Sequence, residues 1–491
     1  MTLFEPGRNI WRMAQADHAA VIVDACDYYR VIRQAMLQAR KRILIIGWDF
    51  DPRIKLDRTG DGNPEETLGD FLLNLPKQNP ELEILILKWD LGALKMLLRG
   101  SAIAWIARLA WQKQVRFRLD HAHPTGCSHH QKIVVIDDCF AICGGIDMTG
   151  DRWDRPVHAD HDPGRVRPNG SEYGPWHDAT MAVDGPAAGA LSEIARDRWF
   201  RATGEQLPIL DMPDCVWPEG LQPQFENLKV AVARNAAAYR EWPAVKEVEA
   251  LFVDMIESAQ RFIYAENQYF TSPVVAAAII RRLERPDPPE IVLVQPLTAD
   301  GWLEQVAMDA ARIRLAQAIG RHDPDNRFRI FTPKTQQGQD IYVHAKLMIV
   351  DDQVLRVGSS NLNNRSLGLD SECDLALEAV DDAQRDGIAA LRTQLMAEHL
   401  GTERERVVDE FSRSGSLLAT IEALRGPGHS LALLPIEKPS DAAEFIADRE
   451  LLDPKSPDLM FEGMTHRSLF SPIRERWRGR RHFRRHAEAT V

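Results

Sequence analysis

The chain of 491 residues has only six cysteines, no CxxC pair and no hydrophobic run near the ~18 residues needed to span a bilayer. The sparse cysteines indicate neither a disulfide framework nor a structural zinc ribbon, and Cys139 and Cys143 are interpreted as buried packing thiols. Residues 1–23 lack a basic segment followed by an apolar stretch, so no secretory signal peptide is predicted. We therefore expect a reduced, cytoplasmic protein without a membrane span.

Positive charge is also scarce, since the formal net charge is −12. This acidic balance argues against a general nucleic-acid binder, because such proteins usually carry a basic surface. Residues 467–485 are the exception, with eight arginines against the single acid Glu475. Such a tail would attract an anionic membrane surface at ~1 kcal/mol per charge, and a solvated terminus is the equal alternative.

The chain does contain an internal repeat. Two short apolar segments, residues 42–50 and 261–270, are each preceded by apolar residues at helical spacing. Buried strands are predicted next at residues 84–87 and 115–119 in the first copy, and at 291–294 and 327–331 in the second. Alternating strands and helices predict an α/β fold built from two duplicated α/β/α sandwich halves. We expect the halves at residues 1–205 and 229–400, joined by a linker at 206–228 and followed by a helical extension at 401–491.

Each half also carries the pattern H-x-K-x4-D, which we call the first motif (residues 130–137) and the second motif (residues 344–351). If the motif lies on a strand, its histidine and lysine project from one face, so that both reach one pocket. An imidazole beside a fixed ammonium suits attack on, or proton donation to, a phosphate oxygen. A single copy of this pattern is weak evidence, whereas two copies at matching places in a repeat are strong evidence. The motif residues are His130, Lys132 and Asp137 in the first half, and His344, Lys346 and Asp351 in the second.

A small residue follows each motif, with an acid or amide two positions later, at Gly145 and Asp147 and at Ser359 and Asn361. Small residues would let a phosphate approach the backbone closely. Asn361 can donate a hydrogen bond to a phosphoryl oxygen, whereas Asp147 cannot unless it is protonated. Trp48 and Gln268, at the ends of matching strands, are predicted to line the pocket, with ordinary capping as the competing interpretation.

Together with the flanking segments 129–132, 144–154, 176–178, 266–270 and 358–366, these motifs resemble the two-motif enzymes of the phospholipase D superfamily. The resemblance covers roughly residues 5–400. It implies two halves related by pseudo-twofold symmetry that share one active site, with a covalent phosphohistidine intermediate and no cofactor or metal. By resemblance, His130 is the nucleophile and His344 the acid, while Asp178 and Glu372 are the carboxylates that orient the two imidazoles. Asp137 and Asp351 are expected to fix structure rather than touch the substrate.

The resemblance implies a phospholipase D that cleaves the distal phosphodiester of a glycerophospholipid, or transfers the phosphatidyl group to an alcohol, in peripheral contact with a membrane. A cardiolipin or phosphatidylserine synthase and a nuclease of the same superfamily are the alternatives, although no nucleic-acid partner is expected at a net charge of −12. The cluster of His121, His123, Cys127 and His129 fits no standard zinc spacing, so no metal is predicted there. Oligomeric state is not predicted.

Overall fold

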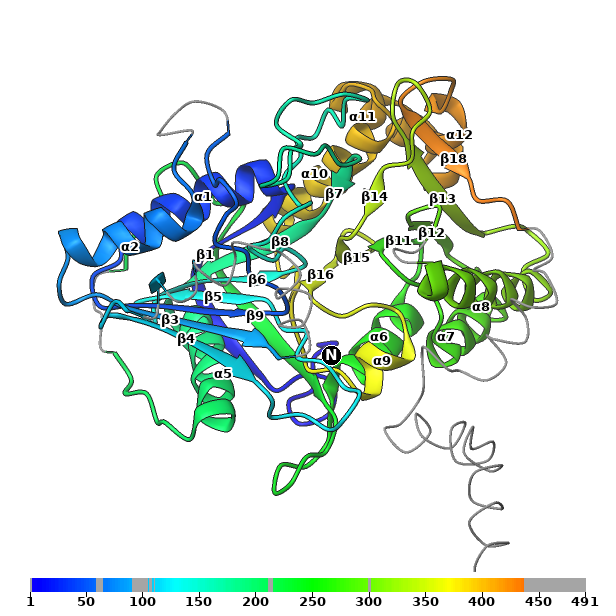
Figure 1. Cartoon of the computed structure of the whole chain (residues 1–491). Coiled ribbons are helices and arrows are strands. Elements are labelled where there is room, and N and C mark those ends of the chain that lie inside the picture. The colour runs from blue at the N-terminus through cyan, green and yellow to red at the C-terminus, as the bar shows by residue number, and fades with distance from the viewer. Residues whose placement is uncertain are drawn as a thin grey trace, which may run out of the picture.

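The computed structural model describes residues 2–58, 65–90, 105, 108, 109, 111–210, 215–298 and 302–436 (Figure 1). In chain order, the first repeat contains β1 (Arg12–Val23), α1 (Ala25–Leu37), β2 (Arg42–Gly47), α2 (Leu68–Gln78), β3 (Glu83–Trp89), β4 (Val115–Asp120), β5 (Ile133–Ile136), β6 (Phe140–Gly144), β7 (Trp176–His177), β8 (Ala179–Asp184) and α5 (Gly185–Thr203). The strands expected in this repeat at residues 42–50, 84–87 and 115–119 are therefore present as β2, β3 and β4, and α1 is the helix expected before β2.

The second repeat follows the same order of elements. It contains β9 (Phe225–Ala236), β10 (Val245–Lys246), α6 (Glu247–Ser258), β11 (Phe262–Asn267), α7 (Pro273–Leu283), β12 (Glu290–Val294), α8 (Trp302–Gly320), β13 (Phe328–Lys334), β14 (Tyr342–Val343), β15 (Lys346–Val350), β16 (Val354–Gly358), α9 (Asn364–Gly368), β17 (Glu372–Glu378) and α10 (Asp382–His399). β9 begins at Phe225, inside the range expected to be linker. The extension contributes α11 (Arg404–Ser414), α12 (Leu417–Leu424) and β18 (Ser430–Leu433), and the arginine-rich residues 467–485 lie outside the described residues.

The strands of both repeats join into one sheet, except β7 and β14, which pair with each other in a separate two-stranded sheet. β1 and β9 run antiparallel side by side at its centre. Moving outward from β1 the order is β8, β6, β5, β2, β3, β4, and from β9 it is β17, β16, β15, β11, β12, β13 and then β18. Corresponding strands therefore occupy corresponding places on the two sides, which is a pseudo-twofold arrangement. The α/β fold with duplicated halves is confirmed, with the addition that the two sheets are continuous.

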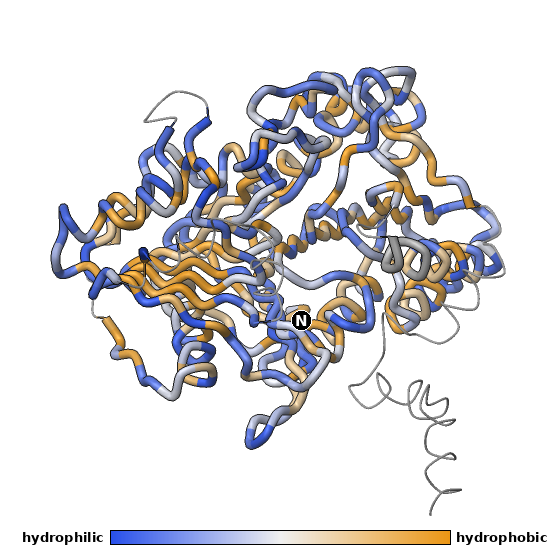
Figure 2. The backbone as a smooth tube through the Cα atoms, in the orientation of Figure 1, coloured by the Kyte–Doolittle hydropathy of each residue, from blue (hydrophilic) through white to orange (hydrophobic). Residues whose placement is uncertain are grey.

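Alternating residues of these strands face opposite layers of helices, as the period of two along a strand requires. One core, shared by both repeats, places side chains such as Leu44, Ile133 and Leu347 against α5 and α10–α12. On the other face, α1 and α2 cover the first repeat and α6, α7 and α8 cover the second. Figure 2 shows the resulting hydrophobic centre along the strands and the more hydrophilic outer loops. No helix within the described part of the chain is both long and apolar enough to cross a membrane.

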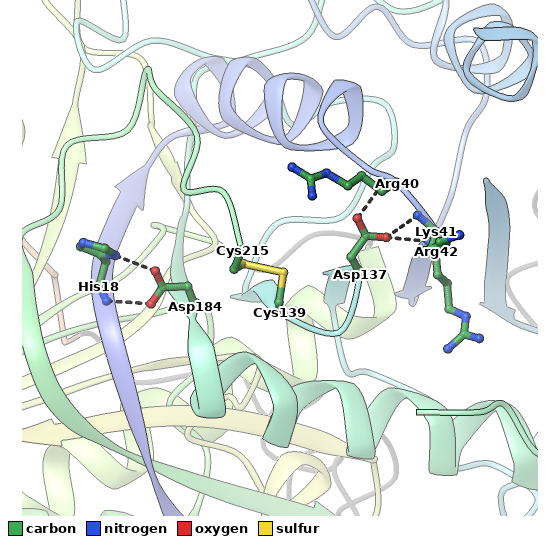
Figure 3. The surroundings of a disulfide bond; sticks show 8 residues. All are labelled: His18, Arg40, Lys41, Arg42, Asp137, Cys139, Asp184 and Cys215. Atoms are coloured by element: carbon green, nitrogen blue, oxygen red, sulfur yellow. Dashed lines mark hydrogen bonds and ion pairs between the residues drawn. A yellow bond between two sulfur atoms is a disulfide. The ribbon is translucent and has the colours of Figure 1, made fainter. Parts of the chain in front are cut away.

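The interpretation of Cys139 as an unpaired packing thiol is wrong, and so is the expectation that all cysteines are reduced. Cys139, in the turn between β5 and β6, forms a disulfide with Cys215, which precedes β9 (Figure 3). Their Cα atoms are 5.6 Å apart, although 76 positions separate them in the sequence. No local sequence signal predicts this pairing, because the two cysteines come together only when the first repeat folds. Cys143 is buried and unpaired, as predicted.

Candidate active site

The two motif histidines are each held by a carboxylate from the opposite repeat. The Nδ1 atom of His130 lies 3.0 Å from both carboxylate oxygens of Glu372, on β17. The Nδ1 atom of His344 lies 2.7 Å from Oδ2 of Asp178, which directly precedes β8. Each carboxylate is fully buried, whereas the imidazoles keep 16% and 7% of their side-chain surface exposed. The structure thus brings the four residues into two crossed pairs, which fix the ring orientation and leave both Nε2 atoms without a hydrogen-bond partner among the described residues.

The backbone creates this crossing. The amide of His130 donates to the carbonyl of Ser371 at 3.0 Å, and the amide of His344 donates to the carbonyl of His177 at 2.7 Å. Ser371 and His177 directly precede the two carboxylates, so each motif enters its strand along the edge of the other repeat. The histidines therefore lie just before β5 and β15 rather than within a strand, which differs from our expectation. β5 and β15 are each bound on both edges by strands of their own repeat, so the contact with the other repeat is made by the residues that precede them.

The neighbouring His129 can be distinguished from His130 by its contacts. Its Nδ1 atom lies 2.7 Å from Asp120, and its Nε2 atom lies 3.2 Å from the carbonyl of Gln131. The ring is fully buried. Because both nitrogens are engaged, His129 has none to offer to a substrate.

Two buried ammonium groups flank the imidazoles. Lys132 Nζ donates to the carbonyl of His130 at 3.0 Å and lies 3.4 Å from Oδ2 of Asp147. Lys346 Nζ donates to the carbonyl of His344 and to Oε1 of Gln268, the latter at 3.2 Å. Each lysine therefore binds the backbone of the histidine two residues before it.

The acid and amide that follow the motifs have different surroundings. Oδ1 of Asp147 accepts the backbone amide of Trp48 at 3.0 Å, so this carboxylate holds the end of β2. Asn361 donates through Nδ2 to Oε1 of Gln268 at 3.4 Å, and its Oδ1 atom is buried without a partner in the described part of the chain. The two repeats are therefore unequal at this position, as their residue types suggested.

The small residues after the motifs make room for the carboxylates. A Cβ at Gly145 would lie 2.0 Å from Oδ1 of Asp178, a distance that no side chain tolerates. The hydroxyl of Ser359 donates to Oε2 of Glu372, and Ser366 donates to Oε1 at 2.7 Å. We had expected Gly145 and Ser359 to admit a phosphate, whereas their closest neighbours are the groups that orient the histidines.

Burial dominates the electrostatics of this site. Burial, followed by the charges of Lys132 and Lys346, lowers the pKa of His130 well below its ordinary value. Burial and Lys346 act in the same direction on the pKa of His344. Burial also lowers the pKa of Lys346 to about 7 and raises that of Glu372 to about 7. Both imidazoles are therefore neutral at pH 7 in the free protein, each with a lone pair available on Nε2.

Aromatic rings border the two histidines. The ring of Trp48 meets that of His130 edge-on, with 6.5 Å between centroids, and stacks on Trp89. On the other side, Trp176 lies 5.1 Å from the ring of His344 and stacks on Tyr342 at 4.6 Å. Trp48 therefore lies beside the motif histidine of its own repeat.

The motif aspartates lie at the far ends of β5 and β15. The carboxylate of Asp137 accepts three backbone amides at 2.7 Å from Arg40, Lys41 and Arg42 (Figure 3). Asp351 accepts the corresponding amides of residues 260–262 at 2.6–2.8 Å. Both aspartates therefore bind the first residues of the neighbouring strand. Each lies five positions after its motif lysine, or ~16 Å along an extended chain at 3.3 Å per residue.

A buried ionic cluster behind Asp178 was missed by the sequence analysis. The Nδ1 atom of His177 lies 2.7 Å from Glu398 and 3.2 Å from Asp24, while Nε2 of His158 lies 3.2 and 3.6 Å from the same two residues. These ligand-type atoms lie within 4.8 Å of one another, so the group could hold a metal ion, as could His177 with Glu266 and His399. Asp24 also accepts the backbone amide of Asp178 at 3.2 Å, which ties the cluster to the site. Together the two groups come from five separate segments, around residues 24, 158, 177, 266 and 398–399, so their spacing in the sequence gives no signal.

Known proteins resemble this chain in sequence and in fold. The phospholipase D family profile matches residues 35–275 and 317–417. Phospholipase D A of Dictyostelium discoideum is 26% identical over 80% of this chain, and phospholipase D1 of Saccharomyces cerevisiae is 25% identical over 88% of it. The chain spans only 36% and 31% of the lengths of these two relatives.

Among solved structures, the phosphatidylserine synthase of Haemophilus influenzae Rd KW20 superposes with a TM-score of 0.55 at 14% identity, covering 85% of this chain and 98% of that one. This likeness shows a shared fold. The sequence profile covers well over half of the chain, including both motifs. The chain therefore belongs to the phospholipase D family.

Proposed function

We propose that the protein is a phospholipase D, which cleaves the distal phosphodiester of a glycerophospholipid into phosphatidic acid and a free alcohol. The observation that carries the proposal is the crossed pair of histidines. Each has Nδ1 fixed by a buried carboxylate and Nε2 unengaged, and a lysine ammonium group is bound to the backbone carbonyl of each histidine. This set suits displacement at the phosphorus of a phosphodiester without a cofactor.

In the first step, Nε2 of His130 attacks phosphorus and the bond from phosphorus to the head-group oxygen breaks. That oxygen takes the Nε2 proton of His344 and leaves as the alcohol. The negative charge of the bound phosphodiester favours the protonated form of His344. The product of this step is a phosphatidyl group on His130.

In the second step, a water molecule attacks phosphorus while Nε2 of His344 takes its proton. The bond from phosphorus to His130 breaks, which releases phosphatidic acid and regenerates the neutral imidazole. A primary alcohol in place of water would give a phosphatidyl alcohol by the same route. Hydrolysis and transfer therefore share one intermediate.

The lysines and amides would stabilise charge on the non-bridging oxygens. Lys132 and Lys346 are fixed by the carbonyls of the histidines they follow, so they need no reorganisation during the reaction. We propose that Asn361 and Gln268 complete this surface from the second repeat, and that Trp48 borders it from the first. Peripheral contact with a membrane follows from the proposed substrate.

The test supplies phospholipids of several head groups together with ethanol. We expect phosphatidic acid and phosphatidylethanol, in a ratio that rises toward phosphatidylethanol with ethanol concentration. Phosphatidyl transfer without release of phosphatidic acid would favour a synthase-type phosphatidyltransferase. The absence of both products, with cleavage of an oligonucleotide instead, would replace the proposal by a nuclease.

A further inference from the structure

A cavity of about 280 Å³ lies between the two repeats, bordered by α5 of the first repeat and by β9 and β10 of the second. None of the four motif histidines and lysines lines it, so it is separate from the site described above. Two acids of its wall, Glu193 and Asp197, are each paired with an arginine. The other polar side chains of the wall come from both repeats, and they are Gln131, Arg198, Arg201, Arg234, Asn235 and Ser371.

Two of the three arginines have hydrogen-bonding capacity that the protein does not use, whereas Arg234 is held by a carboxylate. Arg198 pairs with buried Asp120 through Nε, while its Nη2 atom is buried and has no hydrogen-bond partner in the described part of the chain. Arg201 forms one ion pair there, with Asp197 at 2.7 Å, and this pair contributes little because the Asp197 side chain is 48% exposed. Burial lowers the pKa of the Arg201 guanidinium, so a further anion beside it would favour the charged form. The cavity wall is therefore suited to an anionic group.

Hydrogen-bond acceptors in the wall are also left over. The amide of Gln131 donates through Nε2 to the carbonyl of Glu372 at 3.2 Å, and that of Asn235 donates through Nδ2 to the carbonyl of Asp370 at 2.8 Å. These contacts fix the orientation of both amides, and their oxygens, like Oγ of Ser371, are buried without a partner among the described residues. Unpaired buried acceptors cost free energy, so a ligand that fits this wall must donate hydrogen bonds as well as accept them.

The same wall holds the backbone of one catalytic pair. The amide of His130 donates to the carbonyl of Ser371 at 3.0 Å, and Gln131 binds the carbonyl of Glu372. Asn235 lies directly opposite Glu372 in the register of β9 and β17. A ligand in the cavity would therefore contact side chains whose backbone positions His130 against Glu372.

We propose that this cavity is a second ligand site, which binds a small organic anion carrying hydroxyl groups and, when occupied, rigidifies the backbone between His130 and Glu372. The anionic group, a carboxylate or a phosphate, accepts from Arg198 and Arg201, since guanidinium groups form charge-assisted hydrogen bonds with both. The hydroxyl groups donate to the two amide oxygens. This inference goes beyond the proposed function, because the ligand is bound and not cleaved.

The experiment measures binding by calorimetry with two hydroxylated probes, glycerol 3-phosphate and malate, and with inorganic phosphate and succinate as their counterparts without hydroxyl groups. Wild type is compared with Arg201→Gln, which removes a charge from the wall, and with Val245→Trp, which fills the cavity from β10. Lys246→Gln is the matched control, because it removes a cation at the next position, where the exposed side chain does not line the cavity. Thermal melting of each variant checks that it is folded, and hydrogen exchange of residues 129–132 is followed with and without the probe.

We expect at least one hydroxylated probe to bind more tightly than its counterpart, and the probe that binds identifies the anionic group. Arg201→Gln should weaken its binding by roughly tenfold or more, the usual effect of losing a charge-assisted hydrogen bond. Val245→Trp should abolish binding, Lys246→Gln should leave it unchanged, and the bound probe should slow exchange at the His130 amide in wild type.

Binding that survives both Arg201→Gln and Val245→Trp would overturn the inference, since the anion would then lie elsewhere, for example between the motif lysines. Binding of neither hydroxylated probe, or equal binding of the counterparts, would overturn it as well, and unchanged exchange at His130 would overturn the link to the catalytic pair. No turnover enters these measurements, so their outcome is independent of whether the protein cleaves a phospholipid.

Discussion

At the scale of single residues, the two histidines are chemically alike but are proposed to do different work. His130→Asn removes the nucleophile and should lower kcat by about 10⁴-fold or more for every substrate. His344→Asn removes a proton donor and should cost about 10²–10⁴-fold for an alkyl head group. A p-nitrophenyl leaving group needs no proton, so its release in single-turnover measurements should recover in His344→Asn and not in His130→Asn. Recovery in the opposite variant would reverse the two roles.

Glu372 makes the second prediction at this scale. Burial raises its pKa from 4.5 to about 7, so the folded protein binds a proton there at pH values where the unfolded chain does not. The stability contributed by the protonated carboxyl is fully present below pH 4.5 and is lost as the pH rises through 7. Glu372→Gln should therefore stabilise the protein at pH 8, by up to about 3 kcal/mol, with little effect at pH 4.5.

The measurement is urea unfolding of wild type and Glu372→Gln at both pH values, with activity measured in parallel. The same substitution should strongly reduce turnover, because an amide does not fix the tautomer of His130 as a carboxylate does. A variant that is less stable than wild type at pH 8 would show that the charged carboxyl stabilises the fold instead.

At the scale of elements, the end of β6 and the start of β8 must approach closely to place Asp178. Gly145→Ala would put a methyl group 2.0 Å from Oδ1 of Asp178 and so displace the partner of His344. We expect a fall in kcat of about tenfold or more with KM little changed. Gly150→Ala is the matched control, because nothing lies within 4 Å of the added atom. Equal activities of the two variants would contradict the positioning role of Gly145.

The elements themselves could largely be predicted from the sequence. Apolar periodicity located α1 and α6, and short β-branched runs located β2, β3 and their counterparts, because each pattern is local. The crossed pairs could not be predicted, since the contact of His130 with Glu372 spans 242 positions and depends on β1 meeting β9. The cluster around His177 was missed for the same reason. Its residues share one buried volume but no spacing in the chain.

At the scale of the whole molecule, the Cys139–Cys215 disulfide fastens the segment that joins the repeats to the first repeat. Closing a loop with a sequence separation of 76 should stabilise the fold by about 2–4 kcal/mol, largely by restricting the unfolded chain. Reduction should therefore lower the Tm of wild type and leave that of Cys139→Ser unchanged, with Cys26→Ser as the control. Thiol titration of the unfolded, unreduced protein should find four free cysteines, and six would contradict the disulfide.

The acidic whole and its basic end make a further prediction at this scale. Removal of residues 467–491 deletes the run of eight arginines from a chain whose net charge is −12. We expect weaker sedimentation with anionic vesicles at low salt, since each arginine near such a surface contributes ~1 kcal/mol, and no change with neutral vesicles. Unchanged binding to anionic vesicles would leave the tail as a solvated terminus.

The shared active site is tested most directly by trapping its intermediate. In His344→Ala, a phosphatidyl substrate with a p-nitrophenyl leaving group should still react with His130, and hydrolysis should stall because no base activates water. Trypsin separates the two motifs into peptides 119–132 and 335–346 in this sequence. Mass spectrometry after rapid quenching at alkaline pH should find the phosphatidyl group on His130 in the first peptide. A phosphatidyl group on the second motif in His130→Ala, with none on His130 in His344→Ala, would contradict the assignment of the nucleophile, and its absence from both would contradict the covalent mechanism.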